Sequence, residues 1–168
     1  MPPADSTGAA CSGKNLGLKS AGSAARLRLK PMANMPTPAQ RRRLERAARA
    51  AARHSYSPYS RFRVGSAVLT GSGRIFAGCN VENASYGLCN CAERTAIFSA
   101  AAAGERRVRA VVVYTPTPKP TLPCGACRQV INEFGPDAVV ISICDSARRK
   151  ETSLAELLPH AFGPKDLG

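Results

Sequence analysis

Two short cysteine motifs constrain the fold of this chain more than any other feature. Cys91 and Glu93 lie in a Cys-Ala-Glu-Arg run, and Cys124 and Cys127 lie in Pro-Cys-Gly-Ala-Cys. Three thiolates can occupy three corners of a zinc tetrahedron and leave the fourth for water, and a nearby carboxylate can move the proton of that water. Because a closed structural site has no use for Glu93, the motifs favour an open, hydrolytic zinc site.

Two other interpretations of these cysteines remain open from the residues alone. A closed four-cysteine site would add Cys89, but its spacing to Cys91 is poor, since such motifs usually place at least two residues between ligands. A dithiol redox pair would use only Cys124 and Cys127. That interpretation leaves Cys91 and Glu93 without a role.

An arginine follows each motif directly. Three thiolates on a dication leave a net negative centre, which weakens zinc as a Lewis acid unless positive charge offsets it. Arg94 and Arg128 can supply that charge, and both motifs begin helical patterns whose amino-terminal dipole favours thiolate. We therefore expect both arginines to lie near the sulfur atoms and to offset their negative charge.

The composition indicates one globular domain in a reducing compartment. With 168 residues and 44% hydrophobic content, the chain can bury a full core. Seven cysteines are an odd number, and no stretch resembles a secretory signal or a membrane span, which argues against a disulfide framework. We therefore predict a cytoplasmic protein in which Cys11, Cys79 and Cys144 are bystanders.

The positive charge is concentrated at the amino-terminal end of the chain. Residues 1–53 hold 11 basic and two acidic side chains, a net charge of +9, whereas the remaining residues carry +4. The charge of the remainder therefore does not demand a nucleic-acid partner. Residues 1–36 are rich in Ser, Gly, Ala and Lys, so we predict a disordered basic extension there, with organellar targeting as an alternative.

Order is predicted to begin with a capped helix. Thr37, Pro38 and Gln40 have the pattern of a capping box, and the helix is predicted to end near His54. Its arginine-rich face can contact phosphates, but such a face is more often simply solvated.

The rest of the chain alternates between strand and helix patterns. Hydrophobic patterns predict strands at 62–69, 74–79, 108–114 and 138–144, and helices at 91–103 and 124–134. Ser153 and Glu156 cap a last short helix. This order predicts a three-layer α/β plan with a mixed sheet, in which the two cysteine motifs face one another at helix starts.

Several motifs share the order and spacing of a known family. They are Tyr59, Phe62-Arg63-Val64-Gly65, Gly78-Cys79-Asn80-Val81-Glu82-Asn83-Ala84, Cys89-Asn90-Cys91-Ala92-Glu93-Arg94-Thr95-Ala96 and Pro123-Cys124-Gly125-Ala126-Cys127-Arg128-Gln129. Together they resemble the cytidine deaminase family in its small homotetrameric branch, over about residues 38–167. The resemblance implies a three-layer α/β/α fold with a mixed five-stranded sheet, and a catalytic domain at residues 37–168.

The resemblance also implies a zinc enzyme. Cys91, Cys124 and Cys127 match the ligands of one Zn²⁺ per subunit, Glu93 matches the proton shuttle, and Arg94 matches a residue that hydrogen-bonds the cysteine sulfurs. The implied reaction is hydrolytic deamination of cytidine and deoxycytidine to uridine and deoxyuridine, with release of ammonia, as in pyrimidine salvage.

A substrate site and a homo-oligomer follow from the same resemblance. The matching substrate-binding positions are Phe62, Asn80, Glu82, Ala84, Tyr86 and Phe162. Asn80 and Glu82 would hold a ribose hydroxyl, Tyr59 and Tyr86 would contact a neighbouring subunit, and Phe162 would reach into its site, as expected of a tetramer. From the residues alone, Asn80 and Glu82 can also be turn residues, and Phe62 and Phe162 can pack within their own chain.

The expected partner is therefore a small nucleoside, without membrane or nucleic acid. Two other functions stay open: deamination of another cytosine-bearing molecule, including a base in single-stranded RNA or DNA, and a nucleic-acid-binding zinc module that uses the arginine-rich helix. The lack of an aromatic-rich basic groove disfavours a polynucleotide substrate.

Overall fold

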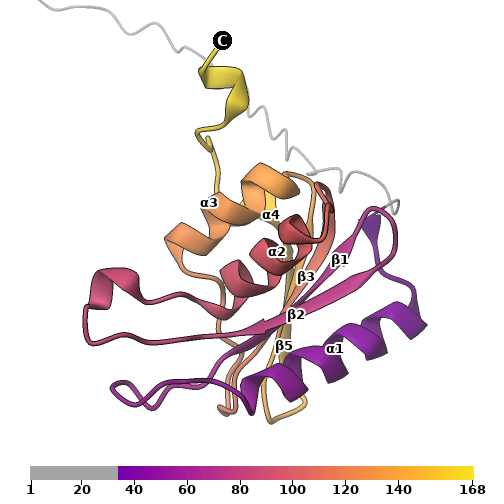
Figure 1. The fold of residues 1–168 in the computed structure, drawn as a ribbon. Helices are drawn as coiled ribbons and strands as arrows, with labels where there is room; N and C mark the ends of the chain where they lie inside the picture. Colours follow the sequence, from indigo (N-terminus) through magenta and orange to yellow (C-terminus); the bar gives the residue numbers. More distant parts are fainter. Residues whose placement is uncertain (1–33) are drawn as a thin grey trace, which may run out of the picture. The chain divides into compact units, whose positions relative to one another are not determined.

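A mixed five-stranded sheet lies at the centre of the molecule, with helices on both faces (Figure 1). The computed structural model describes residues 34–168, so nearly all of the predicted extension at 1–36 lies outside the described residues. The strands are β1 (Gly65–Thr70), β2 (Ile75–Cys79), β3 (Val108–Tyr114), β4 (Val139–Ile143) and β5 (Arg149–Ser153). Their order is β2-β1-β3-β4-β5, and β3 and β4 pair in parallel while the other pairs are antiparallel. The predicted fold class is confirmed.

Helix α1 (Pro38–Ala52) covers one face of the sheet. The predicted capping box forms: the Thr37 hydroxyl accepts from the Gln40 amide, and the Gln40 side chain accepts from the Thr37 amide. Leu44, Ala48 and Ala52 are buried on the side that packs against β1, β3 and β4. The arginines on the other side of α1 remain outside this core.

The opposite face carries α2 (Ala92–Ala102), α3 (Gly125–Phe134) and the short α4 (Leu154–Leu157). The alternation of strand side chains explains the two cores. In β1, Ala67 and Leu69 pack on the α1 side and Val68 packs on the α2 side, as the two-residue period of a strand requires. Two 3-10 turns, at Tyr86–Leu88 and Pro164–Asp166, complete the described elements.

Two glycines allow helices to approach the sheet closely. A Cβ atom on Gly65 would overlap the carbonyl oxygen of Ala48 in α1, and one on Gly78 would lie 2.5 Å from the Ala96 nitrogen in α2. Because α2 carries the first cysteine motif at its start, the contact at Gly78 helps to fix the position of that motif over the sheet.

The first predicted strand began too early. Residues 62–64 precede β1, because the Asn80 side chain binds this segment in place of a neighbouring strand. Its Oδ1 accepts from the Val64 amide at 2.8 Å, and its Nδ2 donates to the Phe62 carbonyl at 2.9 Å. Phe62 is consequently 41% exposed and not part of the core.

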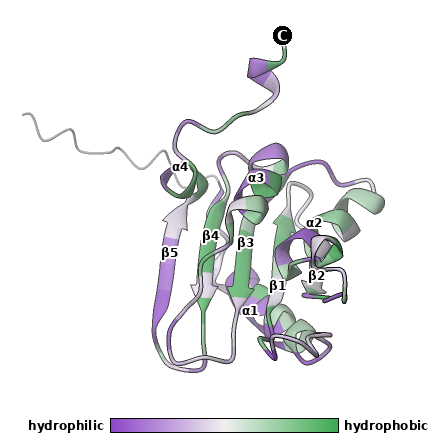
Figure 2. Ribbon diagram, turned by 90° about the vertical axis from the view of Figure 1, so that its left-hand side faces the viewer, coloured by the Kyte–Doolittle hydropathy of each residue, from purple (hydrophilic) through white to green (hydrophobic). Residues whose placement is uncertain are grey.

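Strand β5 was not detectable from hydrophobic pattern, since its sequence is Arg-Lys-Glu-Thr-Ser. It forms the polar edge of the sheet (Figure 2). It pairs with β4 along its length, and ion pairs join it to α1. Arg41 binds Glu151 through both terminal nitrogens, at 2.7 and 3.0 Å, and Arg149 lies 3.3 Å from Glu45. Among the residues described, no helix has the length and apolar character needed to cross a membrane.

Candidate metal centre and active site

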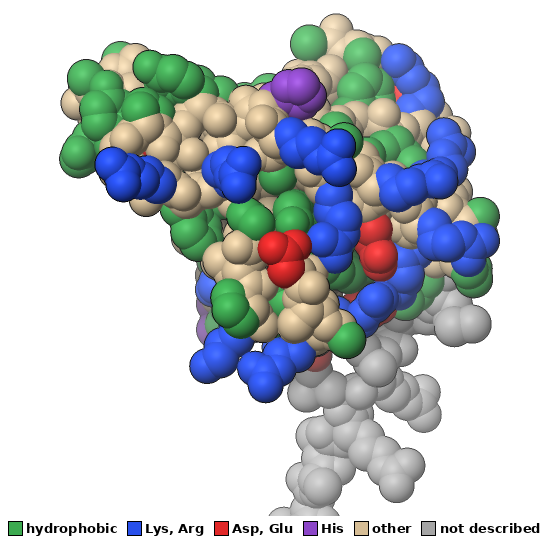
Figure 3. Space-filling view, turned by 90° about the horizontal axis from the view of Figure 1, so that it is seen from below, with side chains coloured by type: hydrophobic (Ala, Val, Ile, Leu, Met, Phe, Trp, Pro, Cys, Tyr) green, Lys and Arg blue, Asp and Glu red, His purple; other side chains and the backbone are tan. Residues whose placement is uncertain are grey.

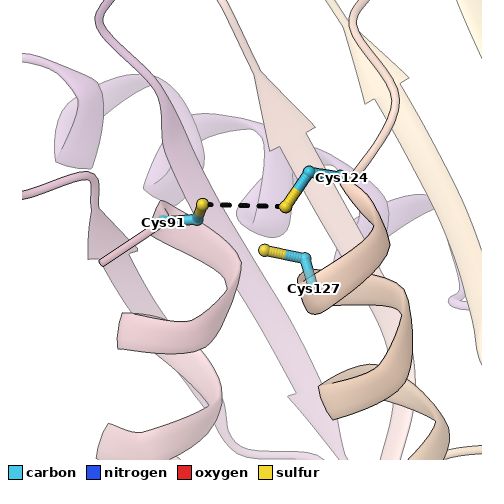
Figure 4. Close-up of side chains that lie close together, drawn as sticks. All are labelled: Cys91, Cys124 and Cys127. Carbon is cyan, nitrogen blue, oxygen red and sulfur yellow. Dashed lines mark hydrogen bonds between the residues drawn. The ribbon is translucent and has the colours of Figure 1, made fainter. Parts of the chain in front are cut away.

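The three predicted ligand thiols converge at the starts of two neighbouring helices (Figure 4). Cys91 is the N-cap of α2, Cys124 is the N-cap of α3, and Cys127 lies in the first turn of α3. The Sγ atoms of Cys91 and Cys124 are 3.8 Å apart, and all three sulfurs lie within 4.8 Å of one another. Helix N-termini favour thiolate, so the backbone supports the charge that a metal site needs.

This geometry fits zinc. A tetrahedral Zn²⁺ with Zn–S distances of about 2.3 Å separates its sulfurs by about 3.8 Å. Within the described part of the chain, Cys89 lies outside the cluster, and its sulfur accepts a hydrogen bond from the Asn83 amide at 3.3 Å. The arrangement therefore favours three protein ligands with an open fourth position over a closed four-cysteine site.

The two flanking arginines have different roles. Arg94 donates from Nη2 to the Cys91 sulfur at 3.5 Å and to the Cys89 carbonyl at 3.1 Å. Hydrogen bonds from Cys127, and then from Arg94, lower the pKa of Cys91 to about 5 despite its partial burial. The hydrogen bond to Cys91, together with burial, raises the pKa of the Cys127 thiol.

Arg128 does not contact the sulfurs, contrary to expectation. Its Nε donates to the Pro123 carbonyl at 2.8 Å, and its Nη1 donates to the Leu157 carbonyl at 2.9 Å. The side chain thus joins the loop before α3 to the end of α4. Sequence position alone could not separate these two roles, because each arginine directly follows its motif.

Glu93 lies in the first turn of α2 and is 4% exposed. Burial is the main cause that raises the pKa of its carboxyl group, and the negative charge of Cys91 adds to the effect. The nearby Cys127 side chain opposes part of this rise in pKa. A buried carboxyl group beside a metal position, with its pKa shifted toward neutrality, can both accept and return a proton.

The predicted ribose-binding pair fastens the loop that precedes β1. Asn80 binds the Phe62 carbonyl and the Val64 amide, as described above, and its Oδ1 also accepts from the Ser55 hydroxyl at 2.6 Å. Glu82 accepts from the Tyr59 and Ser60 amides at 2.9 and 3.2 Å through Oε2, and from the Ser60 hydroxyl through Oε1. These contacts lower the pKa of Glu82, with the Ser60 hydroxyl as the largest cause.

Ser55 and Ser60 are site-supporting residues that the sequence reasoning missed. Each hydroxyl binds one member of the Asn80 and Glu82 pair. The sequence signal for these two residues was the serine-rich turn at residues 55–60, and serine in a turn indicates only a turn-forming residue.

The remaining predicted positions lie at the surface. Phe62 and Ala84 are exposed on the two loops, and the Tyr59 and Tyr86 rings contact edge to face with centroids 5.9 Å apart. Tyr86 is 70% exposed and Phe162 is 60% exposed. The Phe162 backbone is anchored through its carbonyl, which accepts from the Gln129 side chain at 2.8 Å. One chain therefore presents these rings to solvent.

Comparison with known proteins places the chain in a family. The model of the cytidine and deoxycytidylate deaminase zinc-binding region matches residues 38–143, which include all three clustered cysteines and Glu93. This chain belongs to the cytidine and deoxycytidylate deaminase family. Zinc is accordingly its cofactor, and the three-cysteine cluster is placed to hold it.

Relatives named cytidine deaminase align with about two thirds of this chain and with most of their own length. The cytidine deaminase of Sporosarcina psychrophila is 46% identical over 114 residues, which are 67% of this chain and 84% of the relative. That of Halalkalibacterium halodurans is 47% identical over 67% of this chain and 86% of its own. The crystal structure of the Burkholderia pseudomallei cytidine deaminase has 52% identity and a TM-score of 0.69, covering 72% and 98% of the two chains. The resemblance to the cytidine deaminase family is confirmed.

Proposed function

We propose that this chain catalyses the hydrolytic deamination of cytidine and deoxycytidine to uridine and deoxyuridine, with release of ammonia, in pyrimidine salvage. The observation that carries the proposal is the open three-thiol cluster with the buried Glu93 beside it on α2. The relatives named cytidine deaminase, at 46–52% identity, support the choice of cytidine.

In this proposal Cys91, Cys124 and Cys127 hold one Zn²⁺ per chain. When bound, zinc supplies a Lewis acid that makes water a nucleophile at neutral pH. Glu93 takes the proton of the attacking water and delivers it to the ring nitrogen. It then transfers the proton of the new hydroxyl group on the ring carbon to the amine, so that ammonia leaves as the carbonyl forms. Arg94 offsets the negative charge of the sulfurs through its hydrogen bond to Cys91.

The ribose is assigned to Asn80 and Glu82 by their unused hydrogen-bonding capacity. Nδ2 of Asn80 has two hydrogens and donates one to Phe62, which leaves one donor. Oε1 of Glu82 accepts one hydrogen bond, from Ser60, which leaves one acceptor site. A sugar hydroxyl donates one hydrogen bond and accepts another. The free acceptor site of Glu82 and the free donor of Asn80 therefore match it. Phe62 and Ala84, on the adjoining loops, would line the nucleoside site.

The exposed rings support a homo-oligomer, which we propose to be a tetramer. Large hydrophobic side chains are exposed on the loops around residues 56–88 and on α2, and hydrophobic side chains gather at one end of the molecule in Figure 3. A soluble monomer rarely leaves a patch of this kind uncovered. Tyr59 and Tyr86 would contact a neighbouring subunit, and Phe162 would complete its substrate site. Sedimentation of the zinc-loaded protein as a monomer at micromolar concentration would contradict this assignment.

Residues 37–168 are the catalytic domain in this proposal, and the reaction takes place in the cytoplasm. The six described cysteines are free, and a reducing compartment keeps the three ligand thiols available for zinc.

The proposal is tested by turnover. Purified, zinc-loaded protein is incubated with cytidine or with deoxycytidine, and uridine, deoxyuridine and ammonia are measured beside the Glu93→Gln variant. We expect both products from the parent, and a loss of at least about a thousandfold in kcat in the variant, because the proton shuttle is removed. The variant should keep its zinc, since Glu93 is not in the cysteine cluster. A zinc-loaded parent that forms neither product would refute the function.

A further inference from the structure

A cavity of about 380 Å³ lies on the α1 side of the sheet, away from the cysteine cluster. Arg49 and Arg53 line it from the end of α1, Arg63 lines it from the loop before β1, and Tyr114 and Asp145 line it from the ends of β3 and β4. The cysteine cluster lies at the starts of α2 and α3, which cover the opposite face. The cavity is therefore separate from the candidate active site.

Arg49 is held in the wall of this cavity. Its guanidinium stacks over the Tyr114 ring, 4.4 Å from the centroid, and its Nη2 donates to the Cys144 carbonyl at 2.8 Å. Its Nη1 lies 3.4 Å from the Asp145 carboxylate. An arginine fixed in this way loses little conformational freedom when a ligand binds.

The one acidic group in the cavity is already engaged. The Tyr114 hydroxyl donates to Asp145 Oδ1 at 2.5 Å, and Arg49 forms an ion pair with the same oxygen. By contrast, the Arg53 and Arg63 side chains have no hydrogen-bond or ion-pair partner among residues 34–168. Three guanidinium groups against one carboxylate leave the cavity with two uncompensated positive charges.

We propose that this cavity binds a small anion that carries a phosphate group. Guanidinium groups recognise phosphate oxygens through paired N–H donors, and arginines from separate segments can approach one phosphate from different sides. The volume lies in the range of small-molecule sites, and Tyr114 supplies an aromatic wall. These charges converge on a hollow, which favours a small phosphate ester or free phosphate over a polynucleotide that tracks an open surface.

Lys and Arg side chains are also numerous on the face seen in Figure 3, so the test must separate the cavity from general surface charge. Arg42 and Arg46 of α1 provide the matched control. Both are exposed and lie outside the cavity lining. The double variant Arg42→Gln/Arg46→Gln removes the same charge from the same region as Arg53→Gln/Arg63→Gln.

Binding is measured by isothermal titration calorimetry on the full zinc-loaded chain at constant ionic strength. The probes are inorganic phosphate, adenosine 5′-monophosphate and adenosine, because a purine keeps the probe distinct from a pyrimidine nucleoside. We expect saturable binding of at least one phosphate probe and none of adenosine. The Kd should rise at least tenfold in Arg53→Gln/Arg63→Gln and less than twofold in the control. Tighter binding of adenosine 5′-monophosphate than of inorganic phosphate would identify a phosphate ester as the ligand, and the reverse order would identify free phosphate.

Three outcomes overturn the proposal: no binding of either phosphate probe, equal weakening in both double variants, or saturable binding only of a single-stranded oligonucleotide with a steep salt dependence. Circular dichroism and zinc content verify that the variants are folded. The single variant Arg53→Gln, at an exposed position, gives an independent measurement if the double variant is not folded. It should still weaken binding of the phosphate probe, and unchanged affinity would likewise reject the site.

Discussion

The sulfur atoms of Cys91 and Cys124 lie 3.8 Å apart although 33 positions separate them in the chain. This is the sulfur separation that a tetrahedral zinc with Zn–S distances of about 2.3 Å imposes. The two sulfurs are close because α2 and α3 begin at the same end of the strands, each with a cysteine as its N-cap.

Zinc content should distinguish Cys127 from Cys89. Cys127→Ser removes one of the three proposed ligands, so we expect it to lose most of its zinc and its turnover. Cys89→Ser should retain both, because the Cys89 side chain hydrogen-bonds only the Asn83 backbone and lies outside the cysteine cluster among the described residues. Metal analysis by mass spectrometry measures the outcome, and loss of zinc from Cys89→Ser would require a fourth cysteine ligand.

Arg94→Gln should lower kcat about 10–100-fold, as expected when a group that hydrogen-bonds a metal ligand is removed. The Cys91 sulfur would lose its hydrogen bond and its compensating charge. Turnover per bound zinc is the quantity to compare.

Arg128→Gln is the matched control for that experiment. It removes the bonds to the Pro123 and Leu157 carbonyls, so we expect the free energy of unfolding to fall by about 1–3 kcal/mol while turnover per zinc is retained. Equal losses of turnover in the two variants would contradict the separate roles.

Glu151→Gln should destabilise the attachment of β5 to α1 in a pH-dependent manner. Arg41 lowers the pKa of Glu151, so the carboxylate stabilises the fold above its unfolded pKa of about 4.3, and this stabilisation is lost as the pH falls through the lower, folded pKa. We expect the wild type to be more stable by about 0.5–1 kcal/mol at pH 7. The difference should shrink below pH 4.3 in thermal unfolding, and a difference that is constant across this range would exclude the ion pair as its source.

Gly65→Ala should destabilise the protein by about 1–3 kcal/mol, because the new methyl group forces α1 away from β1. Gly73 is a useful comparison, since it has φ of +87° with open space around its Cβ position. Gly73→Ala should cost only the strain of a left-handed backbone, about 1 kcal/mol. Chemical denaturation measures both, and a Gly65→Ala protein as stable as the wild type would disprove the close contact.

Local patterns determined much of this protein. Thr37 with Gln40 marked the start of α1, the apolar run at 108–114 matched β3, and the two cysteine motifs predicted the three thiols that cluster where a metal can be held. Such signals depend on neighbours in the sequence, through hydrogen-bond caps, side-chain alternation and ligand spacing, so they can be recognised without the fold.

Only the tertiary structure decided the features that depend on distant partners. β5 is polar, and its partners are the β4 backbone and charged side chains of α1, so no hydrophobic periodicity revealed it. β1 begins later than predicted because the Asn80 side chain binds the segment before it. Arg128 donates to backbone carbonyl groups, although its place beside the cysteine motif had suggested contact with the sulfurs. The arginine cavity likewise combines Arg49 and Arg53 of the arginine-rich helix with Arg63 and Asp145, and the sequence did not show that these residues meet. In each case a side chain binds a group far away in the chain, and sequence alone does not report which groups become neighbours.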